Sequence, residues 1–486
     1  MSMIKQFFKN IGYIGIANAA VAVKGLLLIP IIVKSLGESD FGIWAQLLVT
    51  LYLLLPFATL HLGMAFIRFV SGKTRIKDIS TNFSTILLIV IIWSSIISLA
   101  MVASSTYFLS YLIDLSEFSE LILMLALILP LWSINLILFS YFRTRQKFKS
   151  YAGFSVLHNA AEIVFIACLI SIGFGIHGAV LGLAYTFMFI NVLLFSVIVS
   201  EIGLSRPDTS FLSKYLAYAL PLVPLELFWW IADSSDKYIT GYYLGAFSVG
   251  IYAAVYGLSR VVNMFAIPLT FVLGPTLAKF YDSGKMDQVK TLLGISLRVF
   301  IMFAVPIVVG FTVLAKPLLL LLATEDVSDG GYMLVPLITA GMLVYGISAI
   351  FSQVINLVKK TYIAGIVWGF AAGLNIILNI MLIPIIGLIG PAISTFFTFG
   401  FASTVIIYYT RRHLIFGFSW HFMGKCTLAG VLMGVPLWII LGLTGFGLVP
   451  TLLLIGLGAG VYFGSLYLLK AFGEKEMVLL RSFFSR

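Results

Sequence analysis

Long apolar stretches recur along the chain from about residue 10 to about residue 470, and only short polar segments separate them. A helix needs about 20 apolar residues to cross the hydrocarbon core of a bilayer. The pattern therefore predicts an all-α polytopic membrane protein with fourteen spans. These are 10–33, 41–67, 83–104, 119–142, 151–173, 177–200, 214–235, 247–275, 289–315, 331–357, 361–386, 388–410, 425–443 and 449–470.

The positive charges test this number of spans. Of the 30 Lys and Arg residues, 24 fall in the terminal segments or in alternate connections, whereas Lys34, Lys237 and Lys316 fall in the remaining connections. Basic connections stay on the cytoplasmic side during insertion. The bias therefore indicates an even number of spans and predicts that both termini are cytoplasmic.

Composition excludes a soluble domain. The chain is 61% hydrophobic and 10% charged, whereas soluble domains are about 45–50% apolar and about 25% charged. The net charge of +11 is explained by membrane topology, so we expect no nucleic-acid partner.

Cys168 and Cys426 lie in apolar stretches and form no metal-binding pattern. The sequence lacks a P-loop and the HExxH and GxSxG motifs, so we expect no enzyme, cofactor or metal site.

Two pairs of segments indicate an internal duplication. Segment 36–45 (LGESDFGIWA) resembles segment 244–253 (LGAFSVGIYA), at an offset of 208 residues. Gly175 and Gly178 in the hairpin of spans 5 and 6 correspond to Gly387 and Gly390 in the hairpin of spans 11 and 12. Because six spans return the chain to its starting side, the repeats are predicted to be parallel. The predicted parts are an N-lobe (1–200, spans 1–6), a C-lobe (201–412, spans 7–12), and 413–486 with spans 13–14 and a cytoplasmic C-terminus.

Segment 36–45 and the stretch from Pro221 through Asp236-Lys237 to Tyr252 resemble polysaccharide-repeat flippases of the O-antigen (Wzx) type. These belong to the multidrug/oligosaccharidyl-lipid/polysaccharide (MOP) exporter superfamily. The resemblance implies two six-helix lobes facing a central cavity, alternating access, and an undecaprenyl-diphosphate-linked oligosaccharide as cargo. It also implies location in a bacterial inner membrane, and a polysaccharide polymerase and a chain-length regulator as candidate partners.

Three basic residues, Lys24, Arg260 and Arg298, fall inside predicted spans. A charge at the bilayer centre costs at least about 2.5–3.5 kcal/mol, so each needs a reason. One interpretation is that they line a wet cavity and bind a diphosphate, because Arg can bind phosphate through two parallel N–H bonds. The structural alternative is that Lys24 pairs with Glu162 or Glu226 and that Arg298 extends toward the cytoplasm.

Span 7 carries a second polar pattern. Glu226, Trp230, Asp233 and Lys237 are spaced by 4, 3 and 4 residues and share one helix face. We interpret this face as a cavity-lining stripe that contacts sugar or a coupling ion. The alternative is an ordinary aromatic and charged belt at a helix end, which leaves Glu226 unexplained.

His158 and Glu162 lie four residues apart in span 5, as do Asn375 and Asn379 in span 11. The first pair is a candidate proton relay for ion coupling. A buried hydrogen-bonded pair that locks two helices together is the alternative.

These observations predict a flippase that carries the lipid-linked repeat unit from the cytoplasmic to the outer leaflet, driven by an ion gradient, membrane potential or consumption of the product. One alternative is a MATE-like exporter of organic cations, which would require an acidic cavity. A second is a membrane-embedded enzyme of glycan assembly. Such an enzyme usually has a large outer loop, and none is present in this sequence.

Overall fold

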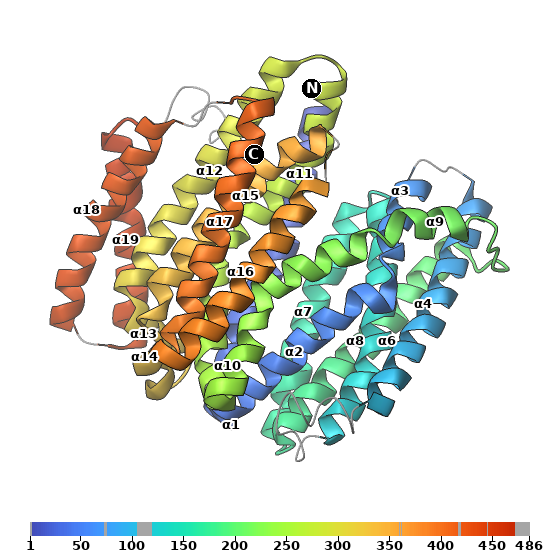
Figure 1. The fold of residues 1–486 in the computed structure, drawn as a ribbon, viewed down its shortest axis with the longest axis horizontal. Helices are drawn as coiled ribbons and strands as arrows, with labels where there is room; N and C mark the ends of the chain where they lie inside the picture. Colours follow the sequence, from blue (N-terminus) through green and yellow to red (C-terminus); the bar gives the residue numbers. More distant parts are fainter. Residues whose placement is uncertain are drawn as a thin grey trace. The chain divides into compact units, whose positions relative to one another are not determined.

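The computed structural model of the chain describes residues 2–71, 75–104, 119–358, 360, 362–416, 419–444 and 446–471. Over these residues it consists of helices and short connections, without strands (Figure 1). The helices are α1 (Ser2–Leu36), α2 (Glu38–Thr59), α3 (Leu62–Val70), α4 (Ile76–Ser104), α6 (Ser119–Thr144), α7 (Phe148–Ser171), α8 (Gly175–Ile202), α9 (Leu212–Ala219), α10 (Leu222–Ser259), the 3-10 helix η3 (Arg260–Met264), α11 (Ala266–Asp282), α12 (Met286–Val313), α13 (Ala315–Leu322), α14 (Glu325–Gly331), α15 (Leu334–Leu357), α16 (Tyr362–Ile386), α17 (Ile389–His413), α18 (Trp420–Thr444) and α19 (Leu448–Leu468).

Thirteen helical segments of the described chain are long and apolar enough to cross a membrane. One of them, Leu212–Met264, has 53 residues and contains predicted span 7 and the first part of predicted span 8, which continues into α11. The chain turns inside this segment at Gly245, whose φ of 78° and ψ of 173° are not helical. Counting the two sides of this turn separately gives the fourteen predicted spans, so the predicted all-α polytopic fold is confirmed.

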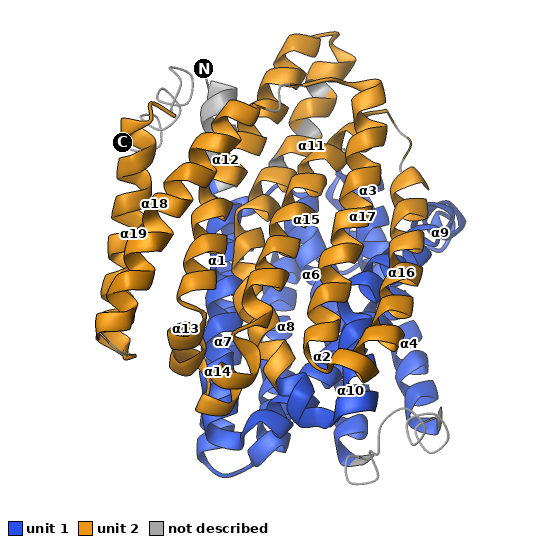
Figure 2. Ribbon diagram, turned by 60° about the vertical axis from the view of Figure 1, so that its left-hand side comes forward, with its two compact units in different colours: residues 1–250 blue, residues 251–486 orange. Residues whose placement is uncertain are grey.

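Unit 1 is the compact unit of residues Met1–Gly250 (Figure 2). In its core, α3, α4, α6, α8 and α9 pack around buried aromatic side chains that include Phe66, Phe83 and Tyr141. The second predicted span is broken in this unit. Leu60 and His61 adopt left-handed conformations (φ 48° and 50°) between α2 and α3.

Unit 2 is the compact unit of residues Ile251–Arg486 (Figure 2). Within it α15 packs against α17, α12 and α11, and α16 pairs with α17 as a hairpin. Helices α18 and α19 pack against each other and against α12. These two helices correspond to predicted spans 13 and 14. The predicted boundaries of the repeats, 1–200 and 201–412, remain a prediction.

The duplication predicted from sequence is visible in the backbone. Gly37 (φ 89°, ψ 175°) and Gly245 (φ 78°, ψ 173°) have nearly the same conformation at equivalent positions. Gly175 and Gly387 also match, with φ of 56° and 62°. Residues with a Cβ rarely adopt these angles, so the glycines are required by the two kinds of turn.

A close crossing within unit 1 shows the same relationship. A Cβ on Gly42 would overlap with the carbonyl oxygen of Ala246, and a Cβ on Gly250 would overlap with the carbonyl oxygen of Glu38. Each pair is related to the other by the offset of 208 residues. The contact is therefore reciprocal, as expected for repeats related by a two-fold axis.

Candidate functional site

A buried ion pair joins α1 to α7 in unit 1. The Nζ of Lys24 donates a hydrogen bond of 2.9 Å to Oε2 of Glu162, and Nε2 of His158 lies 3.6 Å from the same oxygen. The side chains of Lys24 and Glu162 are 20% and 5% exposed. Burying a carboxylate is costly unless a counter-ion compensates it. The structure thus pairs Lys24 with Glu162, one of the two partners that the sequence suggested.

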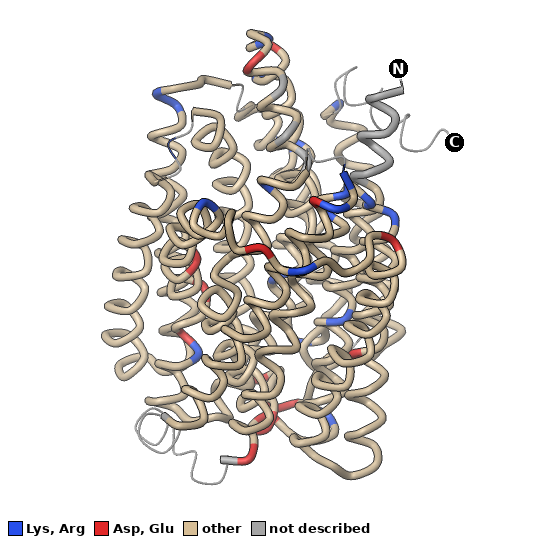
Figure 3. The backbone as a smooth tube through the Cα atoms, turned by 90° about the vertical axis from the view of Figure 1, so that its right-hand side faces the viewer, with Lys and Arg blue, Asp and Glu red and all other residues tan. Residues whose placement is uncertain are grey.

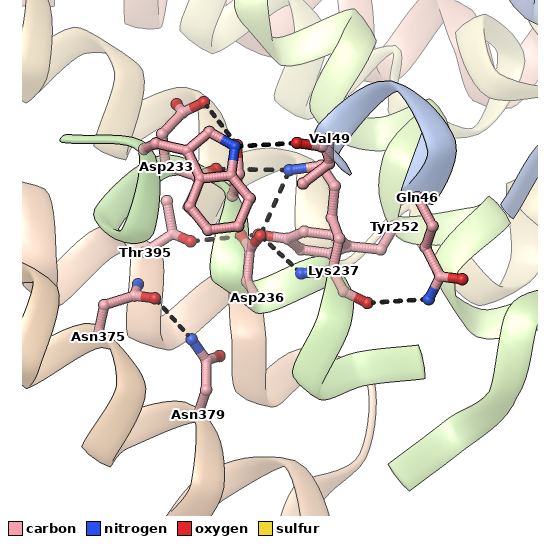
Figure 4. Close-up of polar contacts among 11 residues, drawn as sticks. Gln46, Val49, Asp233, Asp236, Lys237, Tyr252, Asn375, Asn379 and Thr395 are labelled. Atoms are coloured by element: carbon pink, nitrogen blue, oxygen red, sulfur yellow. Dashed lines mark hydrogen bonds and ion pairs between the residues drawn. The ribbon is translucent and has the colours of Figure 1, made fainter. Parts of the chain in front are cut away.

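A second charged cluster lies on α10 within unit 1. Asp233, Asp236 and Lys237 are 5%, 0% and 6% exposed. The Nζ of Lys237 is 3.3 Å from Oδ1 of Asp236 and donates a hydrogen bond of 3.4 Å to the backbone oxygen of Asp233 (Figure 4). The attraction between these neighbours offsets part of the desolvation cost of each charge.

The structure therefore buries only part of the stripe that was predicted on span 7. Trp230, Asp233 and Lys237 are buried, whereas Glu226, at the beginning of α10, is exposed. Asp236 was missed because it lies outside the spacing of 4, 3 and 4 residues. Its position directly before Lys237 was the available signal, since a buried cation needs a nearby acid.

Helix α2 makes polar contacts with this part of α10. The indole nitrogen of Trp230 donates to the backbone oxygen of Val49 (3.1 Å), and the side-chain nitrogen of Gln46 donates to the backbone oxygen of Lys237 (3.5 Å; Figure 4). The hydroxyls of Thr50 and Tyr238 are also hydrogen-bonded. These contacts hold the α10 cluster in place next to the glycine crossing.

Arg260 and Arg298 belong to unit 2. Arg260 is the first residue of η3, where the α-helix of the eighth predicted span changes to a 3-10 helix. Its side chain is exposed, and its guanidinium lies 5.2 Å from the centre of the Tyr256 ring. Arg298 is half-buried on α12. A 3-10 segment inside a long helix often marks a hinge.

The α16–α17 hairpin of unit 2 has an uncharged polar core. The side-chain nitrogen of Asn379 donates to Oδ1 of Asn375 (2.9 Å), and that of Asn375 donates to Oγ1 of Thr398 (3.3 Å). The hydroxyls of Tyr252 and Thr395 are 3.2 Å apart. All five side chains are fully buried. The hydrogen bond from Asn375 to Thr398 links α16 to α17.

Side chains that commonly bind metals are dispersed in the described part of the chain. No three His, Cys, Asp or Glu residues come together there as a metal site would require. Of the two thiols, Cys168 is exposed and Cys426 is buried. The candidate functional groups are therefore the two buried charged clusters within unit 1 and, within unit 2, the two arginines and the neutral polar core of the α16–α17 hairpin.

Comparison with known families places this site in context. The profile of the family described as polysaccharide biosynthesis protein matches residues 31–329, which is more than half of the chain. The chain belongs to this family. The match runs from α1 into α14 and thus includes the α10 cluster, Arg260 and Arg298.

Two relatives come from Haloferax volcanii. They are named "Probable flippase AglR", 27% identical over 244 residues, and "Probable low-salt glycan biosynthesis flippase Agl15", 20% identical over 231 residues. The alignments cover 47% and 48% of this chain, and 50% and 48% of the relatives. The chain thus spans about half the length of the curated relatives it matches.

Solved structures share the fold. The chain aligns with the lipid II flippase MurJ in an inward closed conformation, with a TM-score of 0.71 and 19% identity over 93% of this chain and 97% of MurJ. A MOP superfamily transporter from Pyrococcus furiosus aligns with a TM-score of 0.61 and 14% identity over 84% of this chain and 95% of that chain. At these identities the likeness shows the fold, and the predicted MOP fold is confirmed.

Proposed function

We propose that the protein is a flippase, which moves a lipid-linked oligosaccharide between the leaflets of a membrane by alternating access and catalyses no covalent step. The observation that carries this proposal is the family match over residues 31–329 on a chain with a MOP fold. The names of the two relatives, both flippases, point in the same direction. The short connections between the described helices favour transport over catalysis.

The cargo in this proposal is an undecaprenyl-diphosphate-linked repeat unit of a polysaccharide such as O-antigen. The membrane is a bacterial inner membrane, with both termini in the cytoplasm. A polymerase and a chain-length regulator of the same pathway would take up the product. The basic bias of alternate connections supports the orientation. Mass spectrometry of a co-purified lipid tests the carrier and the glycan together.

Arg260 is the proposed main ligand of the diphosphate. Its guanidinium is exposed at the beginning of η3, within a membrane-spanning segment, and rests on the Tyr256 ring. A guanidinium binds phosphate oxygens through parallel N–H bonds. Arg298 on the neighbouring α12 is proposed to add a second positive charge.

The buried pair of unit 1 is proposed to couple transport to protons. While Glu162 is ionised, its carboxylate binds the ammonium of Lys24. Protonation of Glu162, assisted by His158, would free Lys24 for a phosphate oxygen. Proton uptake would then favour binding of the anionic cargo. On α10, Asp233 and Lys237 are proposed to contact sugar hydroxyls.

A second candidate function is export of small organic cations. It is favoured by one observation, the three acidic residues Glu226, Asp233 and Asp236 against the single Lys237 in one segment of α10. Proteoliposomes separate the two functions. A Glu226→Gln variant that loses export of a cationic dye while glycan translocation persists would support cation export. Loss of glycan translocation in Arg260→Gln supports the flippase.

The expected effect of Arg260→Gln is large. A hydrogen bond to a charged group contributes about 1.5–3 kcal/mol, so we expect glycan translocation to fall by about 10- to 100-fold. Arg260→Lys should retain part of the rate because the charge remains. Lys290→Gln removes an exposed charge at the beginning of α12 and serves as the matched control. Equal rates in Arg260→Gln and Lys290→Gln would rule out the proposed diphosphate ligand.

A further inference from the structure

A cavity of about 260 Å³ lies at one end of unit 1, and none of the residues of the clusters described above lines it. It is located where α4 and α7 begin and where α6 and α8 end. The residues that line it are Ile76, Ile79, Tyr141, Arg145, Lys147, Glu201 and Ile202. The proposed transport function uses none of these residues.

Hydrogen bonds fix the polar wall of this cavity. The hydroxyl of Tyr141, a residue of the unit 1 core, donates to Oε2 of Glu201 (2.6 Å). The Nζ of Lys147 donates to the same oxygen, also at 2.6 Å. The Glu201 carboxylate is thus hydrogen-bonded to both a phenol and an ammonium group, and it neutralises part of the positive charge on this wall of the cavity.

A tight turn between α6 and α7 places the basic residues. Gln146 has a left-handed conformation (φ 54°), and the backbone nitrogens of Arg145 and Lys147 donate to the backbone oxygens of Tyr141 and Phe142 (2.9 Å each). The Arg145 side chain is exposed beside the cavity. The turn therefore presents a guanidinium and an ammonium group at the same rim.

The opposite wall is apolar. Ile76 and Ile79 come from the first turns of α4, and Ile202 is the last residue of α8. Because the cavity lies at the ends of membrane-spanning helices, it is at the level of lipid head groups. Lys77 in the first turn of α4, Arg143 in the last turn of α6 and Lys149 in the first turn of α7 lie at the same helix ends. Figure 3 marks the Lys and Arg positions along the backbone. Basic pockets between helices at this level are suited to phosphate-bearing head groups.

We infer that this cavity binds the phosphate of an anionic membrane lipid. Arg145 is the main phosphate ligand, Lys147 is the second, and the three isoleucines contact the first carbons of the lipid chains. Arg145 and Lys147 exceed Glu201 by one positive charge, which matches a phosphate diester of charge −1. The site shares no residue with the diphosphate site of the proposed flippase.

The Glu201 carboxylate provides a sharp test, because neutralising it is expected to strengthen lipid binding. Glu201→Gln keeps an oxygen that accepts from Tyr141 but removes the negative charge beside Lys147. Removing an acidic residue that is purely structural should leave lipid binding unchanged or weaken it. If the cavity binds phosphate, the same change should strengthen binding.

Native mass spectrometry of the full chain, titrated with phosphatidylglycerol, tests the inference. A basic residue near an anionic lipid surface contributes about 1 kcal/mol, so we expect about fivefold weaker binding in Arg145→Gln and about fivefold tighter binding in Glu201→Gln. Lys149→Gln removes an exposed charge two residues beyond the cavity lining and should leave the affinity unchanged. Thermal unfolding of each variant shows that the fold is retained.

The same titration with a polyprenyl diphosphate identifies the source of the phosphate. Weaker binding of either lipid in Arg145→Gln supports a lipid-phosphate site. The lipid whose binding is weakened more is the occupant of the site. Two results would overturn the inference. One is equal weakening by Arg145→Gln and Lys149→Gln, which would indicate surface charge alone. The other is unchanged or weaker binding in Glu201→Gln. Neither result affects the proposal that Arg260 binds the diphosphate of the transported lipid.

Discussion

The α7–α8 hairpin of unit 1 and the α16–α17 hairpin of unit 2 share an equivalent glycine turn but have different polar interiors. Both turn at a glycine of positive φ, Gly175 and Gly387. Three residues later, Gly178 and Gly390 each approach the preceding helix so closely that a Cβ would meet its backbone at 3.0 Å and 2.9 Å. In α7, however, Glu162 forms a buried ion pair, whereas α16 has neutral amides.

This difference separates the parts of the sequence that build the fold from those that provide chemistry. A glycine turn is required wherever two helices must meet at this angle, so it recurs in both repeats. A buried charge is expensive and has no structural benefit over an apolar side chain of similar size. The Glu162 pair, present in one hairpin, is therefore the better candidate for function.

The largest expected effect is on the charged hairpin. Glu162→Leu leaves the Lys24 ammonium buried without its carboxylate, so we expect a loss of about 3–5 kcal/mol in the free energy of unfolding. The double variant Lys24→Met/Glu162→Leu should recover most of it. Equilibrium unfolding in mixed micelles measures both. If Glu162→Leu alone is as stable as the double variant, the Glu162 carboxylate does not stabilise the buried ammonium of Lys24.

The glycine crossing should be sensitive at both of its equivalent positions. Gly42→Ala and Gly250→Ala each force a methyl group onto a backbone carbonyl, at a cost of about 1–3 kcal/mol. Gly153→Ala is the matched control, because a Cβ there meets nothing within 4 Å. Thermal unfolding of the three variants tests this. A destabilisation confined to one of the two equivalent glycines would contradict the reciprocal contact.

The neutral hairpin should respond less than the charged one. Asn379→Leu removes the donor to Asn375 and leaves a buried amide oxygen with fewer partners, at a cost of about 1–3 kcal/mol. No buried charge is left behind, which is why the loss should be smaller than for Glu162→Leu. The same unfolding measurement ranks the two variants. The reverse order would show that the amide network carries more energy than the ion pair.

The smallest effects should come from the hairpin turns. Gly175→Ala and Gly387→Ala each place a Cβ in a left-handed conformation, which costs about 1–2 kcal/mol per residue. Because a Cβ at either glycine would meet nothing within 4 Å, backbone strain is the whole of the expected loss. The two variants should lower the unfolding temperature equally. Clearly unequal shifts would mean that the two turns are not equivalent.

Much of the fold could be predicted because the length of each apolar stretch and the spacing of the glycines are local properties of the sequence. The break at Leu60 and His61 was not predicted, since Leu rarely adopts a left-handed conformation and the apolar pattern continues across the break. The 3-10 segment beginning at Arg260 likewise had no local signal.

The candidate site was less predictable than the fold. The sequence offered Glu162 and Glu226 as partners of Lys24, and packing between residues 138 positions apart was needed to select Glu162. Asp236 was missed because it lies outside the spacing of the predicted stripe, and the Glu201 cavity was missed because its lining residues come from several helices. Side-chain spacing identifies a helix face, but it does not tell which protein groups cover that face.

The central claim, translocation of a lipid-linked glycan, is tested most directly in proteoliposomes that contain the full chain and a fluorescent undecaprenyl-diphosphate oligosaccharide. An impermeant reductant added outside destroys the label only in the outer leaflet. With the protein present, we predict that nearly all of the label becomes accessible, and that Arg260→Gln slows the second half of the decay. Protection of half of the label, as in vesicles without protein, would contradict the account.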